Sequence, residues 1–305
     1  RDLYWACFSE SIMASGLEAI NFEKSAKHFP HLEQWFLDLD AEPHLLLAHL
    51  SSQKSTRLGL YFEALWEYYL RYADVAQLLA KNRQVSKDKQ TIGEYDFIYY
   101  CFRRQSYIHL ETAVKFYIGD IRVGDNAVTG LAQTNLWIGP ACRDRLDIKY
   151  DSLMHRQLKL SQTEEGEGSL QQLGVNEVAC ELALKGILFY PDNLPQAPGP
   201  IGNDSAHQRG TWLKQCQLST FFAESIQNDG VRWIVLERQQ WCSPMQGVSI
   251  EQLFSSDQLL LWLKSYFSDP QSVPIQISSM EQSTLWRESQ RYFIVSDTWS
   301  CRVNG

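Results

Sequence analysis

Apolar residues recur every three or four positions through the first fifth of the chain and again from Arg57 to Tyr72. This spacing predicts helices over about 3–50 and 57–72, because it places the apolar side chains on one helix face. The expected inner face of the second helix consists of Leu58, Phe62, Leu65, Tyr69 and Tyr72. Glu63 lies beside Phe62, so it either points toward a neighbouring sheet or is a half-exposed surface residue.

The next segment alternates apolar and polar positions, which is typical of β-strands. VAQLLAKNRQV and TIGEYDFIYYCF flank the polar turn SKDKQ, and SYIHLETAVKFYIG follows a second turn at RRQ. These stretches predict β-hairpins, although VAQLLAK equally suits a continued helix. A period of two puts His109, Glu111, Ala113 and Lys115 on one face of the last strand.

A further helix is expected over 140–160, with Pro140 near its first turn. Its apolar side includes Gln157, which points one amide inward. At 100° per residue, four cations form a basic stripe, either a nucleic-acid-binding ridge or an ordinary solvated face beside nearby aspartates: Arg145, Lys149, Arg156 and Lys159. TEEGEGS, which follows, is expected to be a surface loop.

The rest of the chain predicts a buried strand ending at Pro191, a loop rich in proline and glycine, and a C-terminal α+β region. We therefore expect an N-terminal helical segment at 1–50, a core at 51–191 and a C-terminal region at 205–305. The fold class indicated is α/β.

Composition limits the classes of function. With a net charge of −8, the chain does not coat nucleic acid by bulk charge, and a polyanion site needs a local basic patch. No apolar run approaches the roughly 20 residues of a membrane span, and no signal peptide opens the sequence. Seven scattered cysteines without a C-x-x-C pair suit buried thiols in a reducing compartment. We expect a soluble, cytoplasmic protein that contacts no membrane.

Two carboxylates carry the candidate chemistry. Asp96 and Glu111 are fifteen positions apart with a turn between them, so adjacent antiparallel strands can place them on one sheet face. Paired buried carboxylates repel and need a cation, and Mg²⁺ (or Mn²⁺) prefers oxygen ligands and activates water against phosphate. A nearby lysine, here Lys115, would orient that water or neutralise phosphate charge.

The order of RLGLYFE, GEYDF, HLETAVKF and HRQLKL resembles the αβββαβ core of the PD-(D/E)XK nuclease superfamily. More closely, these motifs with KGILFYP and RYFIVSDTW resemble the proteobacterial family of domain of unknown function 1853 (DUF1853). The resemblance implies a restriction-endonuclease-like core with a mixed sheet, N-terminal helices and a C-terminal α+β extension. It covers most of the chain.

The resemblance implies Asp96 and Glu111 as metal ligands, with the Thr112 carbonyl as a third. It also implies Glu63 as a helix carboxylate near the metal and Gln157 as an inward amide at the site. The pattern departs at Ala113, which occupies the position of the superfamily's lysine. Lys115 lies two residues later, roughly 13 Å from Glu111 along an extended strand. His109, on the same face, is an alternative partner for phosphate or water.

Three hypotheses follow from the sequence. The first is a Mg²⁺-dependent nuclease that hydrolyses phosphodiester bonds of DNA or RNA through Asp96 and Glu111. The second is an inactive nuclease-like fold that binds nucleic acid or a protein, which the displaced lysine favours. The third is a structural network in which Glu94, Asp96 and Glu111 pair with lysine and arginine side chains, since ion-pair networks also perturb titratable groups.

Overall fold

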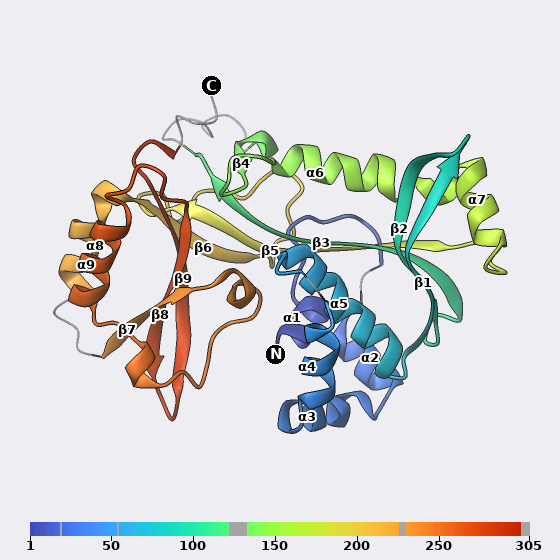
Figure 1. The fold of residues 1–305 in the computed structure, drawn as a ribbon, viewed down its shortest axis with the longest axis horizontal. Coiled ribbons are helices and arrows are strands. Elements are labelled where there is room, and N and C mark those ends of the chain that lie inside the picture. Colours follow the sequence, from blue (N-terminus) through green and yellow to red (C-terminus); the bar gives the residue numbers. More distant parts are fainter. Residues whose placement is uncertain (19, 54, 122–132, 226–229, 300–305) are drawn as a thin grey trace. The chain divides into compact units, whose positions relative to one another are not determined.

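The computed structural model describes residues 1–18, 20–53, 55–121, 133–225 and 230–299 (Figure 1). The chain divides into two compact units. Unit 1 comprises residues 1–115 and 149–186, and unit 2 comprises residues 116–148 and 187–305. This division neither confirms nor contradicts the limits 1–50, 51–191 and 205–305, which stay a prediction.

The described helices are α1 (Asp2–Phe8), α2 (Phe22–His28), α3 (Leu32–Ala41), α4 (His44–Ser51), α5 (Leu58–Tyr72), α6 (Leu146–Ser152), α7 (Glu164–Gln171), α8 (Leu218–Ser225) and α9 (Ser256–Tyr266). The strands are β1 (Ala76–Lys87), β2 (Gln90–Cys101), β3 (Ser106–Gly119), β4 (Trp137–Ile138), β5 (Ala179–Pro191), β6 (Gln208–Lys214), β7 (Val231–Leu236), β8 (Ile275–Gln282) and β9 (Trp286–Val295). None of the described helices is long and apolar enough to cross a membrane.

Within the described ranges the strands form one sheet in the order β1-β2-β3-β5-β6-β9-β8-β7, with β4 beside β3. The β1-β2-β3 and β7-β8-β9 neighbours are antiparallel, whereas β5-β6 and β6-β9 are parallel. The prediction of an α/β protein with N-terminal helices and a mixed sheet is therefore confirmed. All of VAQLLAK except Val75 is part of strand β1 rather than of a helix, which settles that alternative.

Helix α5 supplies much of the core of unit 1. Phe62, Leu65 and Tyr69 are buried, as the apolar spacing predicts. The rings of Trp5 on α1 and Phe62 are 6.4 Å apart, which joins the two helices. Tyr72, expected on the inner face, is 54% exposed because it is the last residue of the helix.

Two predictions about residues 140–171 were wrong. The helix begins at Leu146, not near Pro140, because the backbone first turns through Cys142 (φ 56°) and closes a hydrogen bond from Gly139 N to Asp144 O. TEEGEGS is not a loop but most of α7, whose Thr163 side chain accepts a hydrogen bond from Gly166 N. This N-cap compensates for the low helix propensity of the two glycines.

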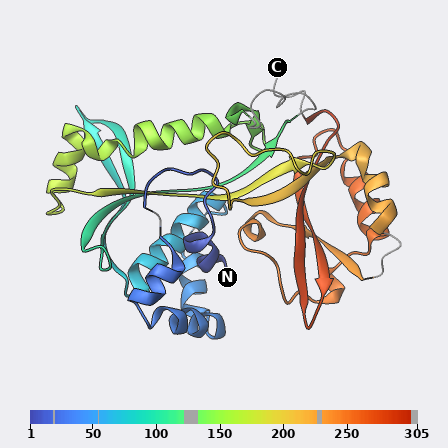
Figure 2. The ribbon, with the colours of Figure 1, turned by 180° about the vertical axis from the view of Figure 1, so that it is seen from behind.

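In unit 2, α8 and α9 lie side by side over β7, β8 and β9, as both views show (Figures 1 and 2). Their apolar residues pack on the sheet around Phe222, Leu259 and Leu263, with Trp233 and Ile277 contributed by the strands. The resulting core belongs to unit 2 itself.

Candidate functional site

Asp96 is held against strand β3 at the place where the β2-β3 ladder ends. The paired residues run from Cys101–Ser106 to Phe97–Leu110. At the next position, Asp96 Oδ2 accepts hydrogen bonds from Thr112 N (2.8 Å) and Thr112 Oγ1 (3.1 Å). The Asp96 carboxylate thus accepts the hydrogen bond of a backbone amide on β3, in place of a strand partner. This contact holds Asp96 next to Glu111, the residue before Thr112. The prediction that these two acids share one sheet face agrees with this register.

Glu111 is fully buried, which is rare for a carboxylic acid. His109 Nε2 and Glu111 Oε1 share a hydrogen bond of 2.8 Å. Gln157 Nε2 donates to Glu111 Oε2 at 2.6 Å. Both carboxyl oxygens are therefore engaged, and the inward amide expected at Gln157 is in place.

A π-helical turn, Leu153–Gln157, presents that amide. Such turns insert an extra residue per turn and occur frequently at functional sites. Here it follows α6 directly and ends at Gln157, whose Oε1 accepts a 3.2 Å hydrogen bond from Lys149 Nζ. Lys149, Gln157 and Glu111 consequently form a continuous chain of contacts.

The two acids have strongly perturbed protonation equilibria. Burial raises the pKa of Glu111 to about 8, against hydrogen bonds from the Asp96 backbone and Gln157 and the charge of Lys149. Burial and the Glu111 charge raise the pKa of Asp96 to about 6, opposed by the Thr112 hydrogen bonds and Lys149. Lys149 thus lies close enough to favour ionisation of both carboxyls.

Glu63, on α5, lies close enough to Asp96 for the two carboxyl groups to interact electrostatically. Burial and the charge of Asp96 raise its pKa, and a hydrogen bond from Asn82 opposes this. Asn82 Nδ2 lies 3.3 Å from Glu63 Oε2. The α5 carboxylate is therefore half-exposed, as one alternative expected, and it also lies near enough to Asp96 for that charge to act on it.

The remaining predicted residues lie elsewhere. Lys115 is half-buried on β3, and Ala113 is buried at the position where the sequence resemblance expected a lysine. Arg145 belongs to unit 2, where its guanidinium is 2.8 and 2.9 Å from the Asp147 carboxylate oxygens. Arg156 and Lys159 are exposed. Lys149, which sequence spacing assigned to the basic stripe, instead contacts the carboxylate site.

The fit of a divalent ion depends on the oxygens that remain. Asp96 Oδ1 accepts no hydrogen bond from any residue in the described ranges. Among those residues, no three His, Cys, Asp or Glu side chains converge as a metal-binding group. Mg²⁺ commonly takes only one or two protein carboxylates and keeps several waters. Asp96 fits this smaller ligand set through its Oδ1 atom, whereas Glu111 would have to accept the ion beside the hydrogen bonds that its two oxygens already make. Glu63 instead accepts a hydrogen bond from Asn82.

A family model described as domain of unknown function (DUF1853) matches residues 1–295. The chain belongs to the DUF1853 family. No curated protein and no solved structure gives a significant match.

Proposed function

We propose that this DUF1853 chain is a divalent-metal-dependent nuclease with a PD-(D/E)XK-like site on β2 and β3. The observation that carries the proposal is the position of Lys149. Its ammonium reaches Gln157, and its charge acts on both Asp96 and Glu111. A lysine beside two buried acids is one combination that supports phosphodiester hydrolysis, because the acids can hold a metal ion and the lysine can stabilise charge on the phosphate.

In this proposal Lys149, rather than Lys115, supplies the cation expected two residues after Glu111. The strand position is Ala113, so the lysine would come from the following helix and approach the acids from the side. A functional group can be delivered by a different element provided that its terminal atoms reach the same place. The hydrogen bond to Gln157 restrains the flexible lysine stem.

Asp96 and Glu111 would hold the ion, which when bound supplies a polarised phosphoryl oxygen and a water of lowered pKa. Lys149 would stabilise negative charge on the phosphate oxygens. Gln157 would position Lys149 and Glu111 relative to each other, because it bonds to both. Arg156 and Lys159, exposed on the following turns, would contact neighbouring phosphates.

The test is hydrolysis of single-stranded, double-stranded and branched DNA and of RNA by the purified chain with Mg²⁺ or Mn²⁺. Asp96→Asn should abolish cleavage. The matched control is Asp151→Asn, an exposed aspartate on α6 outside the site, which should retain it. Equal cleavage by wild type and Asp96→Asn would refute the proposal, because the activity would then come from another site or a contaminant.

A second candidate function has its own support in Glu111. Both of its oxygens are engaged, one by His109 and one by the Gln157 amide, in a fully buried position. That arrangement suits a protonated acid in a binding module that does not cleave. In this case nucleic acid would bind without metal, and calorimetry would detect no Mg²⁺ uptake that depends on Asp96.

A further inference from the structure

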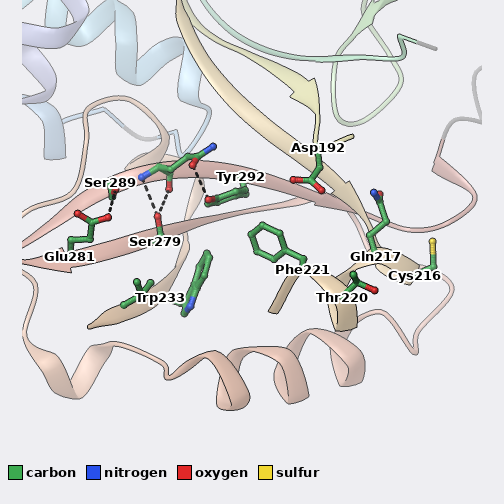
Figure 3. Close-up of a pocket in the computed structure, with 12 residues that line it drawn as sticks. Asp192, Cys216, Gln217, Thr220, Phe221, Trp233, Ser279, Glu281, Ser289 and Tyr292 are labelled. Atoms are coloured by element: carbon green, nitrogen blue, oxygen red, sulfur yellow. Dashed lines mark hydrogen bonds between the residues drawn. The ribbon is translucent and has the colours of Figure 1, made fainter. Parts of the chain in front are cut away.

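Unit 2 contains a cavity of about 780 Å³ that is separate from the acidic site of unit 1 (Figure 3). Its volume lies within the range of small-molecule sites. One wall is the sheet face formed by β7, β8 and β9, and the other is α8 with the 3₁₀ turn Gln215–Gln217 that precedes it.

Three aromatic rings form the middle of this cavity. Phe221 is 5.2 Å from Tyr292 and 5.8 Å from Trp233, and Trp233 is 5.6 Å from Tyr292, measured between ring centroids. The Trp233 ring is further fixed by a hydrogen bond from its Nε1 to Ser256 Oγ (3.0 Å). These rings offer a rigid apolar surface whose faces also attract cations.

Carboxylates lie at both ends of the aromatic group. Figure 3 places Asp192 on one side of Phe221 and Tyr292, and Glu281 on the other. Within the described ranges no side chain donates a hydrogen bond to the half-buried Asp192 carboxylate, and burial raises its pKa. No lysine or arginine is among the described residues that line the cavity.

The second carboxylate is positioned by an irregularity in the sheet. β8 and β9 pair through Ser279–Gln290 and then Met280–Glu288, which leaves Ser289 as the extra residue of a bulge. The Ser289 hydroxyl donates to Glu281 Oε1 at 2.7 Å. Bulges of this kind re-aim side chains beside binding sites.

We propose that this cavity binds an alkyl diamine. One ammonium would pair with Asp192 and the other with Glu281, while the methylene chain lies over Phe221 and Tyr292. Asp192 is level with Ile275 in the strand register, and Glu281 is six residues farther along β8, about 20 Å at about 3.3 Å per residue. The diamine therefore needs a long chain, of about eight methylenes, for its two ends to reach both carboxylates. The two acids and the lack of a lining cation disfavour phosphates and carboxylates. The aromatic surface disfavours a bare metal ion, because such an ion gains nothing from burying apolar area.

The test is calorimetric titration of the full chain with 1,8-diaminooctane near neutral pH and low salt. We expect a Kd on the order of 0.1 mM, with octylamine and 1,8-octanediol each at least about tenfold weaker. Asp192→Asn should weaken diamine binding by about tenfold or more. Asp257→Asn, an exposed aspartate on α9 outside the cavity, should bind as wild type does.

Asp192→Asn should not unfold the protein, since it removes a desolvated carboxylate that has no side-chain partner in the described ranges. Circular dichroism checks this. Phe221→Leu supplies a second variant, which keeps apolar volume but removes the ring, and it should also weaken binding. No heat of binding with about 10 mM diamine, equal binding by octylamine, or unchanged affinity in folded Asp192→Asn would overturn the proposal.

Discussion

Lys149 Nζ donates to Gln157 Oε1 across 3.2 Å, and the same amide donates from its nitrogen to Glu111. The cation is thereby connected to the buried acid through a single side chain that has no charge of its own. We therefore expect Lys149, rather than Lys115, to contribute to catalysis, and we expect Gln157 to position it.

Replacing Lys149 by Met should reduce metal-dependent cleavage by about 10²–10³-fold, the usual effect of removing one group that stabilises transition-state charge. Lys115→Met is the matched control, since it removes a half-buried lysine from β3. It should leave most of the activity. The measurement is the rate constant for cleavage of an oligonucleotide under single-turnover conditions. The reverse ranking would return the catalytic role to Lys115.

The acid pair was predictable, whereas the lysine was not. A turn and strand periodicity suffice to put Asp96 beside Glu111, because each strand residue alternates faces. Lys149 and Gln157 are eight residues apart, which on a regular α-helix separates them by about 80° around the axis. The π-helical turn changes that angle, and no residue pattern in LMHRQ signals it. For the same reason, a constant 100° per residue wrongly placed Lys149 in the basic stripe, whereas its ammonium contacts Gln157 at the acidic site.

Gln157→Leu should separate the positioning role from metal binding. The variant leaves Glu111 Oε2 without its donor, which costs about 1–3 kcal/mol of folding free energy. Activity should fall about tenfold or more through kcat, with little change in the Mg²⁺ dependence. Gln157→Glu would instead add a third acid, which should lower the Mg²⁺ concentration needed only if the side chain at this position contacts the ion. A kcat equal to wild type in Gln157→Leu would remove Gln157 from the mechanism.

Protonation of Glu111 should make stability fall as pH rises. Its pKa is about 8 in the folded protein, above the ordinary 4.5, so the folded state binds more protons than the unfolded state between these values. The contribution of Glu111 to folding stability is therefore fully present below about pH 4.5, and it is lost progressively as the pH rises toward 8. Asp96, with a pKa raised to about 6, acts in the same direction at lower pH.

Glu111→Gln removes this ionisation while keeping an amide oxygen for Gln157. Urea denaturation should show a flatter pH dependence between about pH 5 and 8 than in wild type. Glu177→Gln, at an exposed position of unit 1, supplies the control. If wild type and Glu111→Gln lose stability in parallel over this range, another group is responsible.

Mg²⁺ should stabilise the folded chain, and more so at higher pH, because the ion competes with protons for Asp96 and Glu111. At a Mg²⁺ concentration about one hundred times its Kd, linkage gives about 2.7 kcal/mol. The shift in Tm should be larger near pH 8 than near pH 6, the two values to which burial moves these acids. In Asp96→Asn the shift should vanish. A shift of equal size in that variant would indicate binding elsewhere.

Gly186 tests the backbone that supports the site. It lies on β5 with φ 146°, and a Cβ atom there would be 1.6 Å from the carbonyl oxygen of Lys115 on β3. Gly186→Ala should therefore destabilise unit 1 by about 3 kcal/mol or more, because both the backbone angle and the close approach exclude a side chain.

Gly168→Ala is the contrasting change: a Cβ at this α7 glycine meets no atom within 4 Å. It should stabilise the helix by about 1 kcal/mol. Thermal unfolding of the two variants should consequently shift in opposite directions, and a shared direction would contradict the close β3-β5 contact.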